Sequence, residues 1–209
     1  MESQRAAWDR LYSGNPRPWR GADPGDGSLF PSGALVLEVG CGSGKTAAAM
    51  VSEGVRVVCC DYSEEAVKVC KANVPDAEGW VVADARALPF RDGVFDGVSI
   101  IHVLEHLSDA AVAVGEAVRV LKPGGTLYAR SFSDNDMRAG KGEPVGGFTV
   151  RGNGIGYVYR SAEGFAVLFP GVGAADVAVS SKRTRFGGTR ETLSVSLVKP
   201  SAETFADRG

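Results

Sequence analysis

The pattern of hydrophobic and polar positions divides the middle of the chain into alternating short elements. Five apolar runs have the length and composition of buried parallel strands, at residues 34–40, 55–61, 80–84, 95–101 and 126–131. Segments with helical composition lie between them, at residues 45–53, 63–73 and 108–121. Strands that alternate with helices of this length predict an α/β fold, in which a parallel sheet carries helices on both faces.

The alternation ends after residue 131. Residues 133–156 are rich in glycine and polar residues, which predicts a loop, and residues 161–169 predict a helix. Two alternating runs, 175–186 and 191–200, are joined by Gly187 and Gly188 and predict an antiparallel strand pair that closes the sheet. The expected fold is therefore a doubly wound, mostly parallel seven-stranded sheet with an antiparallel C-terminal strand pair.

The length of 209 residues predicts one domain over residues 1–209. A short helix at residues 3–12 and a Gly- and Pro-rich loop at 13–34 precede the first strand. The expected parts are an N-terminal lead-in or lid (1–33), a core (34–131), an insertion with C-terminal strands (132–200) and a frayed tail (201–209).

Composition and charge exclude several classes of protein. Hydrophobic residues make up 44% and charged residues 23% of the chain, and the net charge of −2 gives no global signal for nucleic acid or an anionic membrane. No run approaches the roughly 20 apolar residues of a membrane span, and the first ten residues lack the apolar core of a signal peptide. The four cysteines have neither zinc nor C-x-x-C spacing, so we expect reduced thiols and a cytoplasmic protein.

The most informative stretch holds Gly40, Gly42 and Gly44, between the first strand and the first helix of the core. Glycine lets a ligand approach the backbone closely, and doubly wound sheets bind ligands beyond the carboxyl ends of their strands. A P-loop would need a glycine where Val39 stands, and a dinucleotide fingerprint would need one where Lys45 stands. NTP and NAD are therefore disfavoured as ligands.

S-adenosylmethionine is the third candidate, because its adenosine carries no phosphate. Asp61 ends the second strand about 20 residues after the loop, where an acid can accept both ribose hydroxyls. Asp84 ends the third strand and can face the adenine amino group. Glu38 precedes the loop and can attract the ammonium group of the ligand, directly or through water.

Five motifs in order carry a family resemblance over roughly residues 34–131: E-V-G-C-G-S-G, C-D-Y-S, A-D-A-R-A-L-P-F, F-D-G-V-S-I-I-H-V-L-E-H-L and L-K-P-G-G-T-L. The series resembles that of class I S-adenosylmethionine-dependent methyltransferases, in particular small domains of the methyltransferase type 11 kind. The resemblance implies a Rossmann-like methyltransferase fold, S-adenosyl-L-methionine as cofactor, S-adenosyl-L-homocysteine as product and a small-molecule acceptor.

The resemblance also implies roles for individual residues. The methionine moiety would contact Gly40, Cys41, Gly42 and Gly44, and the ribose would contact Asp61. Tyr62 would pack on the adenine, Asp84 and the Ala85 backbone would bind its polar edge, and Ile101 and His102 would close the far side of the methionine pocket. Residues 8–19 are similar to the entry segment of small-molecule branches, in which an aromatic residue, here Trp8 or Trp19, covers the cofactor.

The only two histidines form the string H-x-x-E-H with Glu105, and on a helix these three side chains would share one side. The same string is a zinc signature of one peptidase class. The resemblance explains it without a metal and no further ligand is evident, so no metal is expected. His106 is the candidate general base, with a buried capping histidine as the alternative.

The acceptor cannot be identified from the sequence. Its pocket is expected to come from residues 8–30, 102–106 and 132–170. An anionic acceptor would suit four cations, but a solvated strand edge protected by charge is the favoured interpretation of Lys182, Arg183, Arg185 and Arg190. A non-catalytic S-adenosylmethionine-binding or regulatory protein is the alternative from another class, because a fold does not fix a function.

Overall fold

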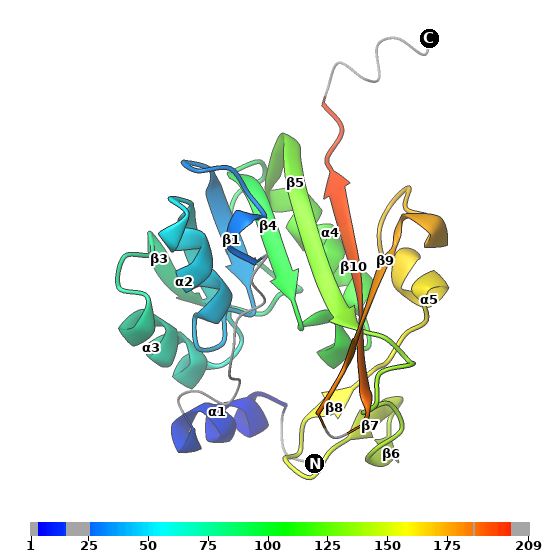
Figure 1. Ribbon diagram of the computed structural model, residues 1–209. Helices are drawn as coiled ribbons and strands as arrows, with labels where there is room; N and C mark the ends of the chain where they lie inside the picture. Colours follow the sequence, from blue (N-terminus) through cyan, green and yellow to red (C-terminus); the bar gives the residue numbers. More distant parts are fainter. Residues whose placement is uncertain (1–3, 16–25, 186, 202–209) are drawn as a thin grey trace.

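A seven-stranded mixed sheet lies at the centre of the computed structural model, which describes residues 4–15, 26–185 and 187–201. The strand order is β3-β2-β1-β4-β5-β10-β9 (Figure 1). The strands are β1 (Leu35–Val39), β2 (Arg56–Asp61), β3 (Gly79–Val82), β4 (Phe95–Ile101), β5 (Leu121–Phe132), β9 (Ala178–Arg183) and β10 (Thr189–Val198).

Strand directions confirm the predicted fold class. The first five strands of the sheet pair in parallel, whereas β10 runs antiparallel to both β5 and β9. The helical elements are α1 (Gln4–Gly14), η1 (Asp26–Ser28), α2 (Lys45–Ser52), α3 (Glu64–Asn73), η2 (Leu104–His106), α4 (Ala110–Val120), α5 (Ala162–Ala166) and η3 (Ala174–Asp176).

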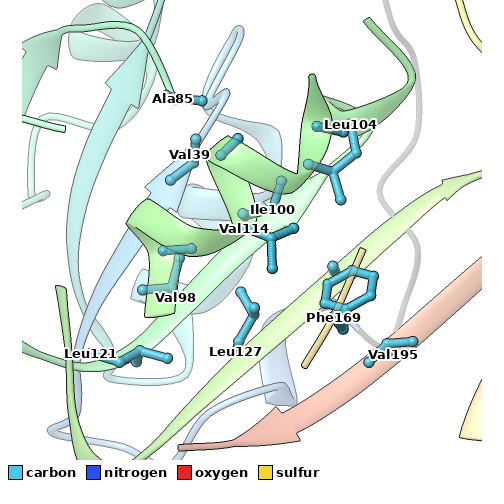
Figure 2. Close-up of a cluster of buried hydrophobic side chains, with 14 of the residues drawn as sticks. Val39, Ala85, Val98, Ile100, Leu104, Val114, Leu121, Leu127, Phe169 and Val195 are labelled. Atoms are coloured by element: carbon cyan, nitrogen blue, oxygen red, sulfur yellow. The ribbon is translucent and has the colours of Figure 1, made fainter. Parts of the chain in front are cut away.

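Hydrophobic side chains of the central strands point alternately to the two faces of the sheet, as the pleat requires. On one face, Leu37 and Val39 of β1 pack in a cluster with Val114 of α4 (Figure 2). On the other face, Val36 packs with Met50 of α2 and Cys70 of α3. Both faces are therefore covered by helices, which makes the sheet doubly wound.

Local chemistry sets the start of α3, which follows the end of β2. The Ser63 hydroxyl accepts a hydrogen bond from the Ala66 amide at 3.1 Å, and Glu64 and Glu65 occupy the first turn. A hydroxyl cap and acidic first-turn residues stabilise a helix N-terminus, as predicted. The cap fixes the backbone directly after Asp61.

The prediction of a loop over residues 133–156 is wrong in part. This segment contains β6 (Glu143–Val145) and β7 (Phe148–Val150), which form a small antiparallel sheet with β8 (Gly156–Tyr157). Strands of two or three residues are too short to establish a period-two pattern. The insertion begins and ends at one place, because Ser133 and Arg160 form a β-bridge and the Asp134 amide donates to the Arg160 carbonyl at 3.0 Å.

Three other predictions concern the cysteines, membrane-spanning segments and the C-terminal residues. All four cysteines are buried and free, and no helix in the described parts of the chain is long and apolar enough to cross a membrane. The predicted frayed tail beyond Ser201 lies outside the described residues.

Candidate functional site

A cavity of about 1270 Å³ opens at the carboxyl ends of the parallel strands. In Figure 1 the arrowheads of β1, β4 and β5 point towards α1 and the small sheet, which border this region. Single-ligand pockets usually measure roughly 300–1,000 Å³. The cavity therefore has room for two small molecules at once.

The glycine loop forms one wall of the cavity. Gly40 and Gly42 line it and have φ angles of 75° and 53°, which favour glycine. A Cβ on Gly42 would lie 2.5 Å from the Tyr12 hydroxyl, so the loop approaches α1 closely. Gly44 does not line the cavity; a Cβ there would lie 2.6 Å from a Val74 methyl group, so this glycine lets the loop pack on the end of α3.

Asp61 connects the end of β2 to the glycine loop. Its carboxylate accepts hydrogen bonds from the Gly42 amide at 2.8 Å and the Ser63 amide at 2.9 Å. Burial raises the pKa of Asp61 to about 6, although these backbone amides lower it. A carboxylate has about four acceptor positions, so Asp61 retains capacity for a ligand hydroxyl at the cavity wall.

Glu38 is a buried acid beneath the same loop. It is only 3% exposed, and its Oε2 atom has no hydrogen-bond partner among the described residues. Burial raises its pKa well above the usual range. A buried polar atom without a partner is costly, so the site favours a ligand that brings a hydrogen-bond donor or a positive charge.

The predicted adenine side of the cavity contains an ion pair that was not predicted. Asp84 accepts hydrogen bonds from the Arg86 guanidinium at 2.7 and 2.9 Å, and these bonds lower its pKa despite some burial. Tyr62 is 36% exposed and has the Arg5 guanidinium 5.0 Å from its ring centre. Ala85 lines the same wall. Arg86 follows Asp84 by two residues in the sequence. The ion pair between them becomes evident only in the folded turn.

The turn after β4 does not have the helical geometry assumed for the H-x-x-E-H string. His102 has a φ of 58°, the only positive value at a non-glycine position among the described residues, and regular structure resumes as η2. The Nδ1 atom of His102 lies 2.9 Å from Glu105, whose other oxygen accepts from the Ser131 hydroxyl at 3.0 Å. His106 bonds elsewhere, so the three side chains do not converge. Within residues 4–15, 26–185 and 187–201, no three His, Cys, Asp or Glu side chains are grouped to hold a metal.

Glu105 is completely buried behind this turn. Burial raises its pKa most, but the interactions with His102, His106 and a backbone amide together outweigh burial, and the pKa of Glu105 lies below its usual value. Arg160 donates to the carbonyls of Leu104 at 2.8 Å and Leu107 at 2.9 Å. The turn is thus held by an internal acid and by a cation from the end of the insertion.

His106 lies at the boundary between the turn and the insertion and lines the cavity. Its Nδ1 atom is 2.9 Å from the Gly156 carbonyl. Its ring packs edgewise against Trp8 at 4.8 Å and Tyr157 at 4.6 Å. Burial lowers the pKa of His106 below its usual value, although the Glu105 charge opposes this. The imidazole is therefore neutral at pH 7 and can accept a proton.

The structure brings most of the predicted residues to one cavity. The lining includes Glu38, Gly40, Cys41, Gly42, Asp61, Tyr62, Asp84, Ala85, Ile101, His102 and His106. Trp8 also lines it, whereas Trp19 lies outside the described residues. Tyr12, Phe132 and Tyr157 also line the cavity. They lie within the ranges expected for the acceptor pocket but were not predicted individually. The spacing of Tyr12, one helical turn after Trp8, was an available signal, whereas the positions of Phe132 and Tyr157 depend on the tertiary fold.

Comparisons with known proteins agree with this geometry. Residues 37–129 match the sequence profile of a family described as "Methyltransferase domain". The demethylmenaquinone methyltransferase of Beutenbergia cavernae is 39% identical over 125 residues, which are 60% of this chain and 51% of that protein. The ubiquinone biosynthesis O-methyltransferase of Xanthomonas axonopodis pv. citri is 37% identical over 111 residues, which are 50% of this chain and 46% of that protein.

A solved structure shares the fold. The phosphoethanolamine N-methyltransferase 2 of Haemonchus contortus, in complex with phosphomonomethylethanolamine and S-adenosylhomocysteine, has a TM-score of 0.70 with this chain at 19% identity. The match covers 96% of this chain and 61% of that one. The match covers about half the length of the demethylmenaquinone methyltransferase and of the ubiquinone biosynthesis O-methyltransferase named above.

Proposed function

We propose, from the premise that residues 37–129 form a class I S-adenosylmethionine-dependent methyltransferase domain, that this protein transfers a methyl group to a small-molecule acceptor. One observation carries the proposal. A single cavity joins the glycine loop at Gly40 and Gly42 to an aromatic compartment around His106. One relative is a demethylmenaquinone methyltransferase and another acts in ubiquinone biosynthesis, which favours a small acceptor here too.

The residues of the loop end fit the cofactor. The unpartnered oxygen of Glu38 suits an ammonium group, and the remaining acceptor positions of Asp61 suit ribose hydroxyls. The absence of a side chain at Gly42 lets the loop backbone approach the Tyr12 hydroxyl, which a Cβ would meet at 2.5 Å. S-adenosylmethionine supplies a methyl group on a cationic sulfur, which is already an activated leaving group.

The chain's own residues then orient the acceptor and accept its proton. Orientation of two reacting groups accounts for a large part of the rate in such reactions. The His106 Nε2 atom is the candidate general base for a hydroxyl or amine acceptor, because the Nδ1 atom faces a carbonyl. Trp8 and Tyr12 of α1 cover the cavity and limit access of water.

Calorimetric titration of the full chain with S-adenosylmethionine, S-adenosylhomocysteine, NAD and ATP tests the cofactor. We expect saturable binding of the first two alone. Incubation with S-adenosylmethionine and demethylated quinols or phenols then tests the reaction, with S-adenosylhomocysteine formed only when an acceptor is present. Binding of NAD or ATP instead would overturn the proposal, and cofactor binding without turnover on any acceptor would favour a regulatory protein.

We also infer a cytoplasmic location from the cysteines. All four are free and buried, and reduced thiols are usual in the cytosol. Fractionation of cells that express the tagged chain checks this inference, which a mainly extracytoplasmic protein would contradict.

A further inference from the structure

Acidic and basic residues of the cavity lining come from different parts of the chain. The acidic lining residues, Asp26, Glu38, Asp61 and Asp84, all precede β4 in the chain. From residue 130 onwards the described lining contains cations and no acid. These cations are Arg130, Arg138, Lys182, Arg183, Arg185 and Arg190. Asp26 pairs with Arg130 at 2.6 Å, and the other five cations belong to the insertion, the last two strands and the turn between them, which gives this part of the lining an excess of positive charge.

The inner face of the last strand pair presents cations and hydroxyls. Ser180 and Lys182 of β9 and Arg190 and Thr192 of β10 all line the cavity. Lys182 lies directly opposite Arg190 in the strand register, and like charges in that position are destabilising. Charge that protects an edge strand would explain Lys182 alone, but it does not explain a second cation on the inner strand β10.

Arg130 pairs with the buried Asp26 at 2.6 Å, whereas two of the other cations have a single acid between them. Arg138 and Arg190 share one buried carboxylate, Asp136, with closest contacts of 2.6 and 3.7 Å. Glu191 alternates to the other face of β10, where it accepts hydrogen bonds from the Ser133 and Ser181 hydroxyls. Burial, with the nearby Arg138 charge, lowers the pKa of Arg190. One carboxylate therefore faces two guanidinium groups here, which leaves an excess of positive charge.

Sheet geometry separates this face from the cofactor residues. The order of strands puts β10 three steps from β1, which carries Glu38. Strands lie about 4.8 Å apart, so three steps span roughly 14 Å. The cationic face therefore belongs to the acceptor end of the cavity. The same cavity is lined by the rings of Trp8, His106 and Tyr157, which pack on one another and suit a planar molecule.

We propose, on the basis of the methyl transfer proposed above, that the acceptor is a planar small molecule with a carboxylate or phosphate group, which Lys182 and Arg190 bind. Arg138 supports this site from the Phe132 ring, where its guanidinium lies 3.6 Å from the ring centre. Serine and threonine hydroxyls beside the two cations supply further donors to the anion.

The test titrates the full chain, with S-adenosylhomocysteine present, with 4-hydroxybenzoate, its methyl ester and phenyl phosphate. We expect the two anions to bind saturably and the neutral ester to bind about tenfold or more weakly, the minimum for one hydrogen bond to a charged group. The tighter of the two anions identifies the acceptor's charged group. Equal affinity for acid and ester, or no saturable binding of either anion, would overturn the proposal.

Variants assign the anion to its site. Lys182→Gln with Arg190→Gln is expected to weaken anion binding about tenfold or more and to leave the ester unchanged. The matched control is Arg56→Gln with Lys68→Gln, which removes exposed cations that pair with Glu78 and Glu65 outside the cavity. The melting temperature of the first variant is expected to change little, because the loss of cross-strand repulsion offsets the loss of the Arg190 contact with Asp136. Anion affinity equal in both double variants would refute the assignment.

The proposed methyl transfer and the proposed anion site can be tested independently. Titration with S-adenosylhomocysteine alone, before any anion is added, reports on the loop end of the cavity. Absence of that binding with retained anion binding would refute methyl transfer and leave the anion site standing. Binding of S-adenosylhomocysteine without anion binding would refute the anion site alone.

Discussion

The Nδ1 atom of His106 lies 2.9 Å from the carbonyl oxygen of Gly156, a residue 50 positions later in the chain. A carbonyl oxygen only accepts hydrogen bonds, so Nδ1 carries the proton and Nε2 carries the lone pair. The insertion thereby sets the tautomer of a histidine that follows β4. The candidate base therefore depends on two segments that are distant in sequence: the turn that carries His106 and the insertion that carries Gly156.

The first prediction concerns this tautomer. We expect the His106 ring to be neutral at pH 7, with Nδ1 protonated, and to titrate below the usual histidine range because it is buried. Nitrogen-15 chemical shifts over a pH series measure both properties. The chain has two histidines, so a His102→Gln variant assigns the signals. A protonated His106 at neutral pH would contradict the proposed role.

A second prediction concerns turnover. With an acceptor that is methylated by the wild type, His106→Gln is expected to lower kcat by about 10²–10⁴, the usual contribution of a general base. Glutamine can still donate to the Gly156 carbonyl but cannot take a proton. Affinity for S-adenosylhomocysteine, measured by calorimetry, should stay within error of the wild type. Unchanged kcat would assign His106 to packing.

Gly42→Ala is expected to weaken S-adenosylhomocysteine binding about tenfold or more, an effect of about 1.4 kcal/mol. The added Cβ meets the Tyr12 hydroxyl and narrows the cavity at the loop. Gly33→Ala is the matched control, because Gly33 also has positive φ, at 83°, but has open space around it. Both variants should lose about 1–2 kcal/mol of stability from left-handed backbone strain. Equal cofactor affinity in the two variants would show that the ligand lies elsewhere.

The raised pKa of Asp61 predicts a pH dependence of cofactor binding. Ribose hydroxyls donate to the ionised carboxylate, so binding is favoured above the pKa of about 6 and weakens as the pH falls through it. Affinity for S-adenosylhomocysteine should be about tenfold lower at pH 5 than at pH 7, since each pKa unit corresponds to a factor of ten. Calorimetry on Asp61→Asn, which cannot ionise, separates this effect from the titration of Glu38. The same pH profile in both proteins would exclude Asp61 as its source.

The raised pKa of Asp61 also affects how the stability of the protein depends on pH. The folded pKa of Asp61 is raised above its ordinary value, so the folded state binds the proton more tightly than the unfolded chain does. The contribution of Asp61 to the stability of the ligand-free protein therefore falls as the pH rises from about 4 to about 6.

Glu105→Ala is expected to lower the free energy of unfolding by about 1–3 kcal/mol. The change leaves the buried Ser131 hydroxyl and the His102 ring without their shared partner. Glu64→Ala is the control, because Glu64 pairs with Lys68 on the exposed surface and such pairs contribute about 0–1 kcal/mol. Urea denaturation measures both variants, and equal losses would contradict a supporting role for Glu105.

The sheet and the glycine loop were predictable because their signals are local. Residues 34–40 are apolar without interruption, and Gly40 and Gly42 follow at the one point where a turn is needed. The turn after β4 was not predictable in the same way. The helical spacing of His102 and His106 suggested a common side, but the positive φ of His102 breaks that spacing.

Other features depend on contacts between distant segments. Nothing near Asp61 in the sequence indicates that its carboxylate accepts from the Gly42 amide. The charges of Lys182 and Arg190 look like surface charges until the register sets them opposite each other beside the cavity. Edge protection stays a prediction for these charges, and the proposed anion site is the alternative that the strand register suggests.

The bridge between Ser133 and Arg160 makes the intervening segment an insertion that leaves the central sheet and returns to it at the same place. Its two ends meet at one point, and Arg160 is fastened to the carbonyls of Leu104 and Leu107. Because β7 pairs with Gly156 and Tyr157, a change of length at the β6–β7 turn, residues 146–147, would leave both the sheet and the Gly156 contact in place. The insertion can therefore vary in length and sequence at this turn, which would change the molecules that the cavity accepts without changing the central sheet.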